Sequence, residues 1–126
     1  MKGRILSLSA NSELGKLRAM VLRQAGYDVK WPSSKSETEA LLGNERFDIL
    51  LIGHTISGHS AREFADAFRA RNPNGKIIVI MATTYIMVKA DKTVRAIDGP
   101  EALLEALGEL LGSNRSAAPM RPAIGE

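Results

Sequence analysis

Cysteine is absent from all 126 residues of the chain, and its absence excludes several kinds of chemistry. Without thiols there is no disulfide framework, no thiolate nucleophile, no iron–sulfur cluster and no cysteine-ligated zinc site. A metal would have to be held by histidine, carboxylate or backbone oxygen. The composition suits a reducing compartment, so we expect a cytoplasmic protein.

Long apolar runs and a strong charge excess are also missing. No run approaches the ~18 residues of a membrane-spanning helix, and the first residues enter a strand-length segment without the features of a signal peptide. We therefore expect no membrane partner. The 17 Lys and Arg residues face 14 Asp and Glu residues, for a net charge of +3. So small an excess does not predict a nucleic-acid partner.

Short apolar segments are the main pattern that is present. Residues 4–8, 48–52 and 77–81 are nearly unbroken apolar runs, which are typical of strands covered by helices on both faces. Residues 27–31 and 93–97 are weaker strand candidates, short and partly polar. We place these two at the edges of the sheet.

Helical patterns fill the intervals between these segments. The first predicted helix ends near Gly26, a residue suited to a helix C-terminus. Ser36 and Ser60 each stand three residues before a glutamate, the capping-box spacing, and so predict the starts of two further helices. Residues 98–100 predict the start of a last helix, which ends at Gly112.

This alternation predicts an α/β fold: a doubly wound, five-stranded parallel sheet in the order 2-1-3-4-5. The link over residues 82–92 is about as short as a parallel crossover allows, so the fourth helix is shortened or missing. A hairpin across 85–97 is the alternative. We expect one domain over residues 1–112 and a flexible C-terminal tail over 113–126, which lacks apolar periodicity.

Several segments, in this order, resemble a response-regulator receiver domain, which is flavodoxin-like. Residues 4–12 resemble its first strand and turn, residues 24–29 the junction before its second strand, and residues 98–104 the start of its last helix. Residues 47–58 resemble its third strand and the following loop. The resemblance covers residues 3–112 and implies a module of two-component signalling.

The resemblance also implies where the phosphorylation pocket of such a domain would lie. The phosphoacceptor aspartate would fall at Gly53, the acidic pair that binds magnesium at Ser9 and Ala10, the switch residue at Met81, and the phosphate-pairing lysine at Ala96. None of these residues has the required chemistry. The resemblance is therefore to a degenerate receiver domain, a pseudo-receiver.

Acyl-phosphate chemistry needs a carboxylate nucleophile and a hard cation held by carboxylates. Neither residues 3–12 nor residues 49–59 contain Asp or Glu. We therefore predict an atypical receiver-like domain that is not phosphorylated on aspartate, is not an enzyme, needs no cofactor and acts by protein–protein contact. The alternative is a small-ligand or anion sensor that uses the crevice at the C-terminal ends of the strands.

His54 and His59 flank that crevice and are the only histidines. Two imidazoles without a nearby carboxylate do not complete a metal site, so we expect loop histidines that hydrogen-bond to backbone carbonyls. The small-residue loop over 53–60 enters a helix, where amides can hold an anion, but it lacks the lysine of a phosphate-binding loop. We expect an ordinary turn there.

The last helix carries an acidic stripe, since Glu101, Glu105 and Glu109 recur every four residues. Basic residues lie in the preceding link and strand, Arg95 among them. A solvated face is one interpretation of the stripe. The other is a contact surface on the last strand and last helix, for a protein partner or a homodimer.

A basic surface is one interpretation of Lys16, Arg18 and Arg23 on the first helix together with Arg62, Arg69 and Arg71 on the third. Nothing in their spacing predicts a helix that reads DNA. Trp31, after the second strand, is interpreted as a cover for the end of the core.

Overall fold

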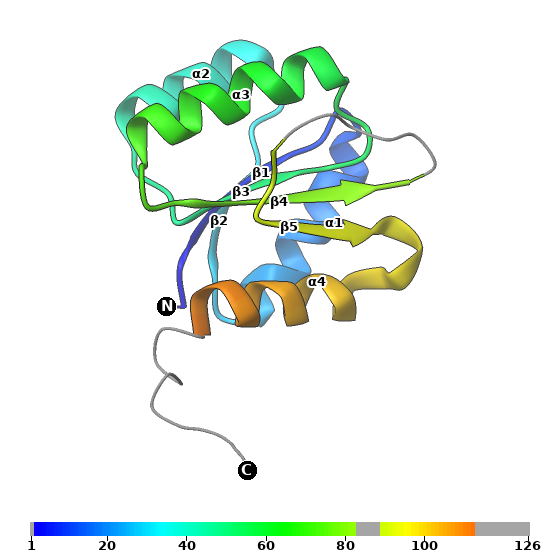
Figure 1. The fold of residues 1–126 in the computed structure, drawn as a ribbon. Coiled ribbons are helices and arrows are strands. Elements are labelled where there is room, and N and C mark those ends of the chain that lie inside the picture. Colours follow the sequence, from blue (N-terminus) through cyan, green and yellow to red (C-terminus); the bar gives the residue numbers. More distant parts are fainter. Residues whose placement is uncertain (1, 83–88, 113–126) are drawn as a thin grey trace.

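A parallel sheet of five strands forms the centre of the molecule (Figure 1). The computed structural model describes residues 2–82 and 89–112, so the predicted tail lies outside the described residues. The order β2-β1-β3-β4-β5, with every neighbouring pair parallel, confirms the predicted sheet. The strands are β1 (Arg4–Leu8), β2 (Asp28–Lys30), β3 (Ile49–Ile52), β4 (Lys76–Met81) and β5 (Lys92–Arg95).

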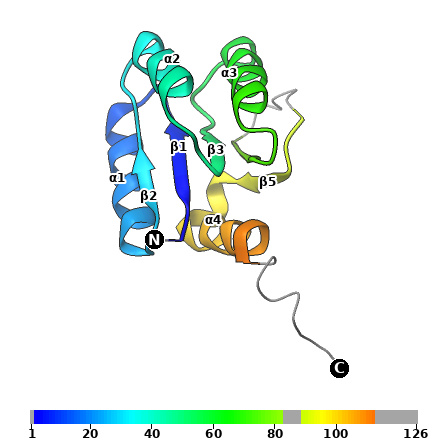
Figure 2. The same ribbon diagram turned by 90° about the vertical axis from the view of Figure 1, so that its left-hand side faces the viewer.

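Helices cover both faces of this sheet. In Figure 2, α1 and α4 lie on one side of the strands, and α2 and α3 lie on the other. No helix among residues 2–82 and 89–112 is long and apolar enough to cross a membrane. The helices are α1 (Ser12–Gln24), α2 (Lys35–Asn44), α3 (Gly58–Arg71) and α4 (Gly99–Leu107), the last of which continues into a π-helical turn (Gly108–Gly112).

The central strand β3 explains why the apolar runs are unbroken. Its four residues are all fully buried, and they alternate between two cores. Ile49 and Leu51 pack with α1 and α4, whereas Leu50 and Ile52 pack with α2 and α3. A strand covered on both faces needs apolar side chains at every position, as the sequence predicts.

The edge strands are short, as expected from their polar residues. Val29 is the buried residue of β2 and Val94 that of β5. Strand β5 ends at Arg95, two residues before the predicted end at 97. The reason is a 3-10 turn over Ala96–Asp98, which redirects the chain into α4.

The link between β4 and β5 returns the chain in parallel. Ile78 pairs with Lys92, and Met81 with Arg95. Asp91 fixes the end of the link, because its backbone N–H donates to the Ile77 carbonyl (2.8 Å) and its carboxylate accepts from the Ile77 N–H (2.7 Å). The described parts of the link contain no helix, and residues 83–88, where a shortened helix or the first half of a hairpin would fall, lie outside the described residues.

The starts of α2 and α3 differ from the predicted ones. Ser34, not Ser36, caps α2: its Oγ accepts from the Glu37 N–H at 3.1 Å. The spacing of a serine three residues before a glutamate is also present at Ser34 and Glu37. The earlier start lets the hydroxyl and the N–H of Thr38 donate to the Ser34 carbonyl, at 2.9 and 3.0 Å. Likewise Ser57, rather than Ser60, caps α3.

Candidate functional site

The loops that follow β1 and β3 meet at the carboxyl edge of the sheet. The Thr55 hydroxyl joins them: its Oγ1 accepts from the Ala10 N–H (2.9 Å) and lies 3.2 Å from the Ser9 Oγ. The Ser9 hydroxyl also donates to the Asn11 carbonyl at 2.9 Å. Where the resemblance implies two carboxylates, the chain therefore has a network of neutral hydroxyls and amides.

Gly53 follows β3 directly and sits against the end of β1. Its N–H donates to the Leu8 carbonyl at 2.9 Å, which holds the two strand ends together. A β-carbon at Gly53 would lie 2.9 Å from that carbonyl oxygen and 2.8 Å from Nη1 of Arg18. Both separations are shorter than a side chain tolerates. The implied phosphoacceptor position thus has no space for a side chain unless both the flexible end of Arg18 and the Leu8 backbone carbonyl shift.

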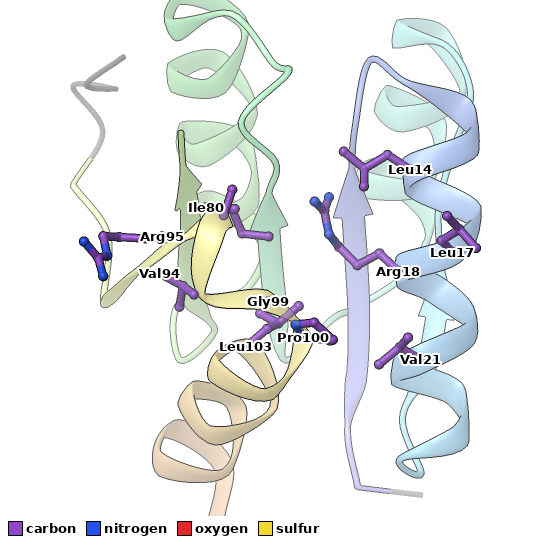
Figure 3. Close-up of a pocket in the computed structure, with 11 residues that line it drawn as sticks. Leu14, Leu17, Arg18, Val21, Ile80, Val94, Arg95, Gly99, Pro100 and Leu103 are labelled. Atoms are coloured by element: carbon purple, nitrogen blue, oxygen red, sulfur yellow. The ribbon is translucent and has the colours of Figure 1, made fainter. Parts of the chain in front are cut away.

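Arg18 extends from α1 toward the strands, as Figure 3 shows, and its Nη1 lies against the Gly53 position. It is half-buried, and its Nη1 is buried without a hydrogen-bond partner. Burial lowers the pKa of its guanidinium below the ordinary arginine value. The interpretation of Arg18 as a surface residue is therefore wrong. Its spacing of four from both Leu14 and Leu22, on the apolar stripe of the helix, is the signal that would have placed it inward.

The neighbouring basic residues do match a surface interpretation. Lys16 and Arg23 are exposed. The Arg23 guanidinium lies 4.5 Å from the centre of the Trp31 ring and donates to the Val29 carbonyl at 2.9 Å. Trp31 packs against the core on the α1 side of the sheet, as expected for a cover.

Met81 and Ala96 share the carboxyl edge of the sheet but not its polar network. Met81 ends β4 and packs against the core under α2 and α3. Ala96 follows β5 and packs against the core under α1 and α4. The sheet thus separates the two side chains, and neither supplies a group that would hold phosphate.

The two histidines lie in different surroundings. His54 is half-buried next to Gly53, and its Nδ1 is buried without a hydrogen bond, so the expected bond to a carbonyl is not found at this atom. His59 is exposed, with its Nε2 3.6 Å from the Glu63 carboxylate. In the part of the chain that the structure describes, no three His, Cys, Asp or Glu residues cluster as metal ligands would.

A crevice of about 360 Å³ opens over the ends of β1 and β3, on the side of α2 and α3. Most of its polar groups already have partners. Ser34 and Ser57 cap helices, Ser9 and Thr55 contact each other, and Lys35 lies 3.5 Å from the Glu63 carboxylate. This crevice therefore gives the sensor alternative little support.

The acidic stripe is exposed on α4 and the turn after it, as predicted for Glu101, Glu105 and Glu109. Of the two basic residues of β5, Lys92 contacts the stripe and Arg95 does not. Lys92 of β5 forms an ion pair with Glu109. Arg95 pairs with Asp98 instead, with Nε 3.0 Å from Oδ2, and this hydrogen bond raises the pKa of Arg95. Glu101 and Glu105 therefore carry the charge of the stripe that remains available to a partner.

The chain is similar to known proteins in its structure. No protein-family model and no curated protein matches the sequence. A CheY-like response regulator receiver domain protein from Methanospirillum hungatei is 20% identical with a TM-score of 0.76, over 91% of this chain and 98% of that chain. The response regulator TrrA from Thermotoga maritima, solved with Mg²⁺-BeF, is 22% identical with a TM-score of 0.72, over 86% and 98%.

TrrA has also been solved in complex with the histidine kinase ThkA, and that copy matches with 22% identity and a TM-score of 0.70, over 86% of this chain and 97% of that chain. These structures share the likeness over nearly their whole length. The parallel strand order and the helices on both faces agree with it. This chain therefore has the fold of CheY-like response-regulator receiver domains.

Proposed function

We propose that this chain is an atypical receiver-like domain, which is not phosphorylated on aspartate and acts in the cytoplasm through contact with a protein. The observation that carries the proposal is the close approach at Gly53. A guanidinium nitrogen lies 2.8 Å from where the β-carbon of a phosphoacceptor would be. The Gly53 position of this chain therefore leaves no room for a side chain unless Arg18 and the Leu8 carbonyl both shift.

Electrostatics supports the same conclusion. Phosphoryl transfer to a carboxylate needs negative oxygens that hold a divalent cation and neutralise the transferred group. Here the nearest groups are the cation of Arg18 and the neutral side chains of Ser9 and Thr55. Since like charges repel strongly where water is excluded, this pocket disfavours Mg²⁺. We accordingly propose no enzymatic activity and no metal cofactor.

The proposed contact surface consists of β5 and α4, with Arg95, Glu101, Glu105 and Glu109. Its support is the exposed, partly unpaired acidic stripe beside an edge strand. TrrA shows that a domain of this fold forms a complex with a histidine kinase. A protein of signalling type, or a second copy of the chain, is the partner that we propose.

The test is incubation of the full chain with acetyl phosphate and Mg²⁺, followed by intact-mass measurement under neutral conditions. TrrA serves as the positive control. We expect no phosphoryl adduct on this chain under conditions that modify TrrA. An alkali-labile adduct of one phosphoryl group, lost on treatment with hydroxylamine, would show that the proposal is wrong.

A further inference from the structure

A cavity of about 210 Å³ lies between α1 and α4, on the face of the sheet opposite the crevice. Most of its wall is apolar, and Figure 3 shows side chains from both helices and from the strands turned toward the same space. The volume is below the ~300–1,000 Å³ typical of sites for drug-sized ligands, so a bound molecule would be small. The apolar lining includes Leu14, Leu17 and Val21 of α1, Ile80 of β4, Val94 of β5 and Leu103 of α4.

Two arginines and no acidic residue line this cavity. Arg95 is held by Asp98 through two hydrogen bonds of 3.0 and 3.1 Å, and in Figure 3 its guanidinium points away from the other labelled side chains. Arg18 points inward and makes no hydrogen bond or ion pair with the residues that the structure describes. The cavity thus combines an apolar wall with one unmatched cation.

Arg4 shows how a partly buried arginine is otherwise treated in this chain. Its Nε donates to Asp28 at 3.0 Å, its Nη2 to Glu45 at 2.6 Å, and its Nη1 to a backbone carbonyl at 2.8 Å. Arg18 has no comparable set of acceptors. A buried charge without a partner is unfavourable, and an anion that accepts from it gains a charge-assisted hydrogen bond in a site of low dielectric.

We propose that this cavity binds a small organic carboxylate whose anionic end pairs with Arg18 and whose compact apolar body lies between α1 and α4. The planar guanidinium has several donors in one plane and matches the two oxygens of a carboxylate. The apolar wall favours a branched aliphatic or single-ring body over a strongly hydrated anion such as sulfate. The inference shares Arg18 with the proposed function, but benzoate titration tests the cavity and acetyl phosphate tests the Gly53 position, so each can fail while the other holds.

The test uses benzoate as the probe and benzamide as its uncharged counterpart of nearly the same shape, each titrated at millimolar concentration into the ¹⁵N-labelled chain. We expect saturable shifts for benzoate at the backbone amides of Leu14, Val94 and Leu103. Benzamide should bind at least about tenfold more weakly, since it lacks the charge. Equal affinity for both probes would overturn the proposal, as would the absence of saturable shifts with benzoate and with 3-methylbutanoate.

Matched variants identify the cation. Arg18→Gln should lower the affinity for benzoate at least about tenfold, whereas Lys16→Gln, which removes the same charge from the exposed side of α1, should leave it within about twofold. The amide spectrum of each variant reports whether it folds. If Arg18→Gln does not fold, Arg18→Lys replaces it. We expect this variant to lose affinity for benzoate as well, because lysine cannot form a bidentate pair with a carboxylate. Unchanged binding in the Arg18 variant would overturn the assignment.

Discussion

At the scale of single residues, Arg18 determines the character of the carboxyl edge. Its guanidinium combines two unusual properties: burial of Nη1 without a partner, and contact with the position where Gly53 would carry a β-carbon. No hydrogen bond or opposite charge among the described residues offsets the cost of removing this cation from water. It therefore lowers the stability of the protein without a ligand. Two residue-scale predictions follow from these properties.

Arg18→Met should raise the free energy of unfolding by about 1 kcal/mol or more, because it replaces a buried unmatched charge with an apolar chain of similar length. Urea denaturation of both proteins measures the difference. The control is Lys16→Met, an exposed residue on the same helix, which should change stability by less than about 0.5 kcal/mol. A less stable Arg18→Met variant would contradict the prediction, because it would mean that the guanidinium stabilises the fold.

Gly53→Ala should lower the free energy of unfolding by roughly 1–3 kcal/mol, since the new methyl group would press on a backbone carbonyl and on Arg18. Gly43→Ala is the matched control: nothing lies within 4 Å of its added carbon, and it is helical. That variant should gain about 0.5–1 kcal/mol. The measurement is the midpoint of thermal unfolding of both variants. A shift of the two midpoints in the same direction would contradict the close approach at Gly53.

At the scale of elements, the helix starts are set by single hydroxyls. Ser34→Ala should cost about 1 kcal/mol, because the Glu37 N–H loses its acceptor. Ser36→Ala, two residues further into the same helix, should stay within about 0.5 kcal/mol. Helix content and urea midpoints of the two variants are the measurements. The opposite order of effects would support the cap that the sequence alone predicts.

The strands were the most predictable elements, for a physical reason. Residues 49–52 are buried on both faces, and such a strand leaves a run of apolar letters that few other structures produce. Caps were less predictable because Ser34 and Ser36 each stand three residues before a glutamate, so the local pattern fits both. In the fold, the Ser34 carbonyl also accepts from the Thr38 hydroxyl.

The absence of carboxylates from the candidate site was predictable from the sequence, but the presence of the Arg18 cation there was not. The missing carboxylates at Ser9, Ala10 and Gly53 are visible in the sequence. The cation beside Gly53 comes from a residue 35 positions earlier, so its approach depends on how α1 packs on the sheet. The spacing of Arg18 from Leu14 and Leu22 puts it on the inward side of α1, but a long charged side chain there usually extends toward water, so the sequence does not predict its approach to Gly53.

At the scale of the whole molecule, the charge pattern gives a test of the contact surface. Glu101 and Glu105 have no ion-pair partner among the described residues, whereas Glu109 pairs with Lys92. The double variant Glu101→Lys and Glu105→Lys therefore reverses the available charge of α4 without breaking that pair. We expect it to weaken self-association or partner capture at least about tenfold, because like charges at a contact are strongly unfavourable.

The matched control is Glu39→Lys with Asp66→Lys, which makes the same change of charge on the α2 and α3 side. Light scattering after size-exclusion chromatography, together with pull-down from a lysate of the source cells, compares both with the unchanged chain. Equal self-association and equal partner capture by the two double variants would show that the contact surface does not lie on α4.

The position of Arg18 also bears on how the chain can change over generations. Gly53→Asp alone would place a carboxylate against the Arg18 guanidinium. The two would form an ion pair, and the paired carboxylate would be a poor nucleophile. Removal of Arg18 alone would leave glycine, which has no reactive group. Phosphate chemistry at this position would thus require at least two substitutions, neither of which brings that chemistry by itself, so no single substitution reaches it.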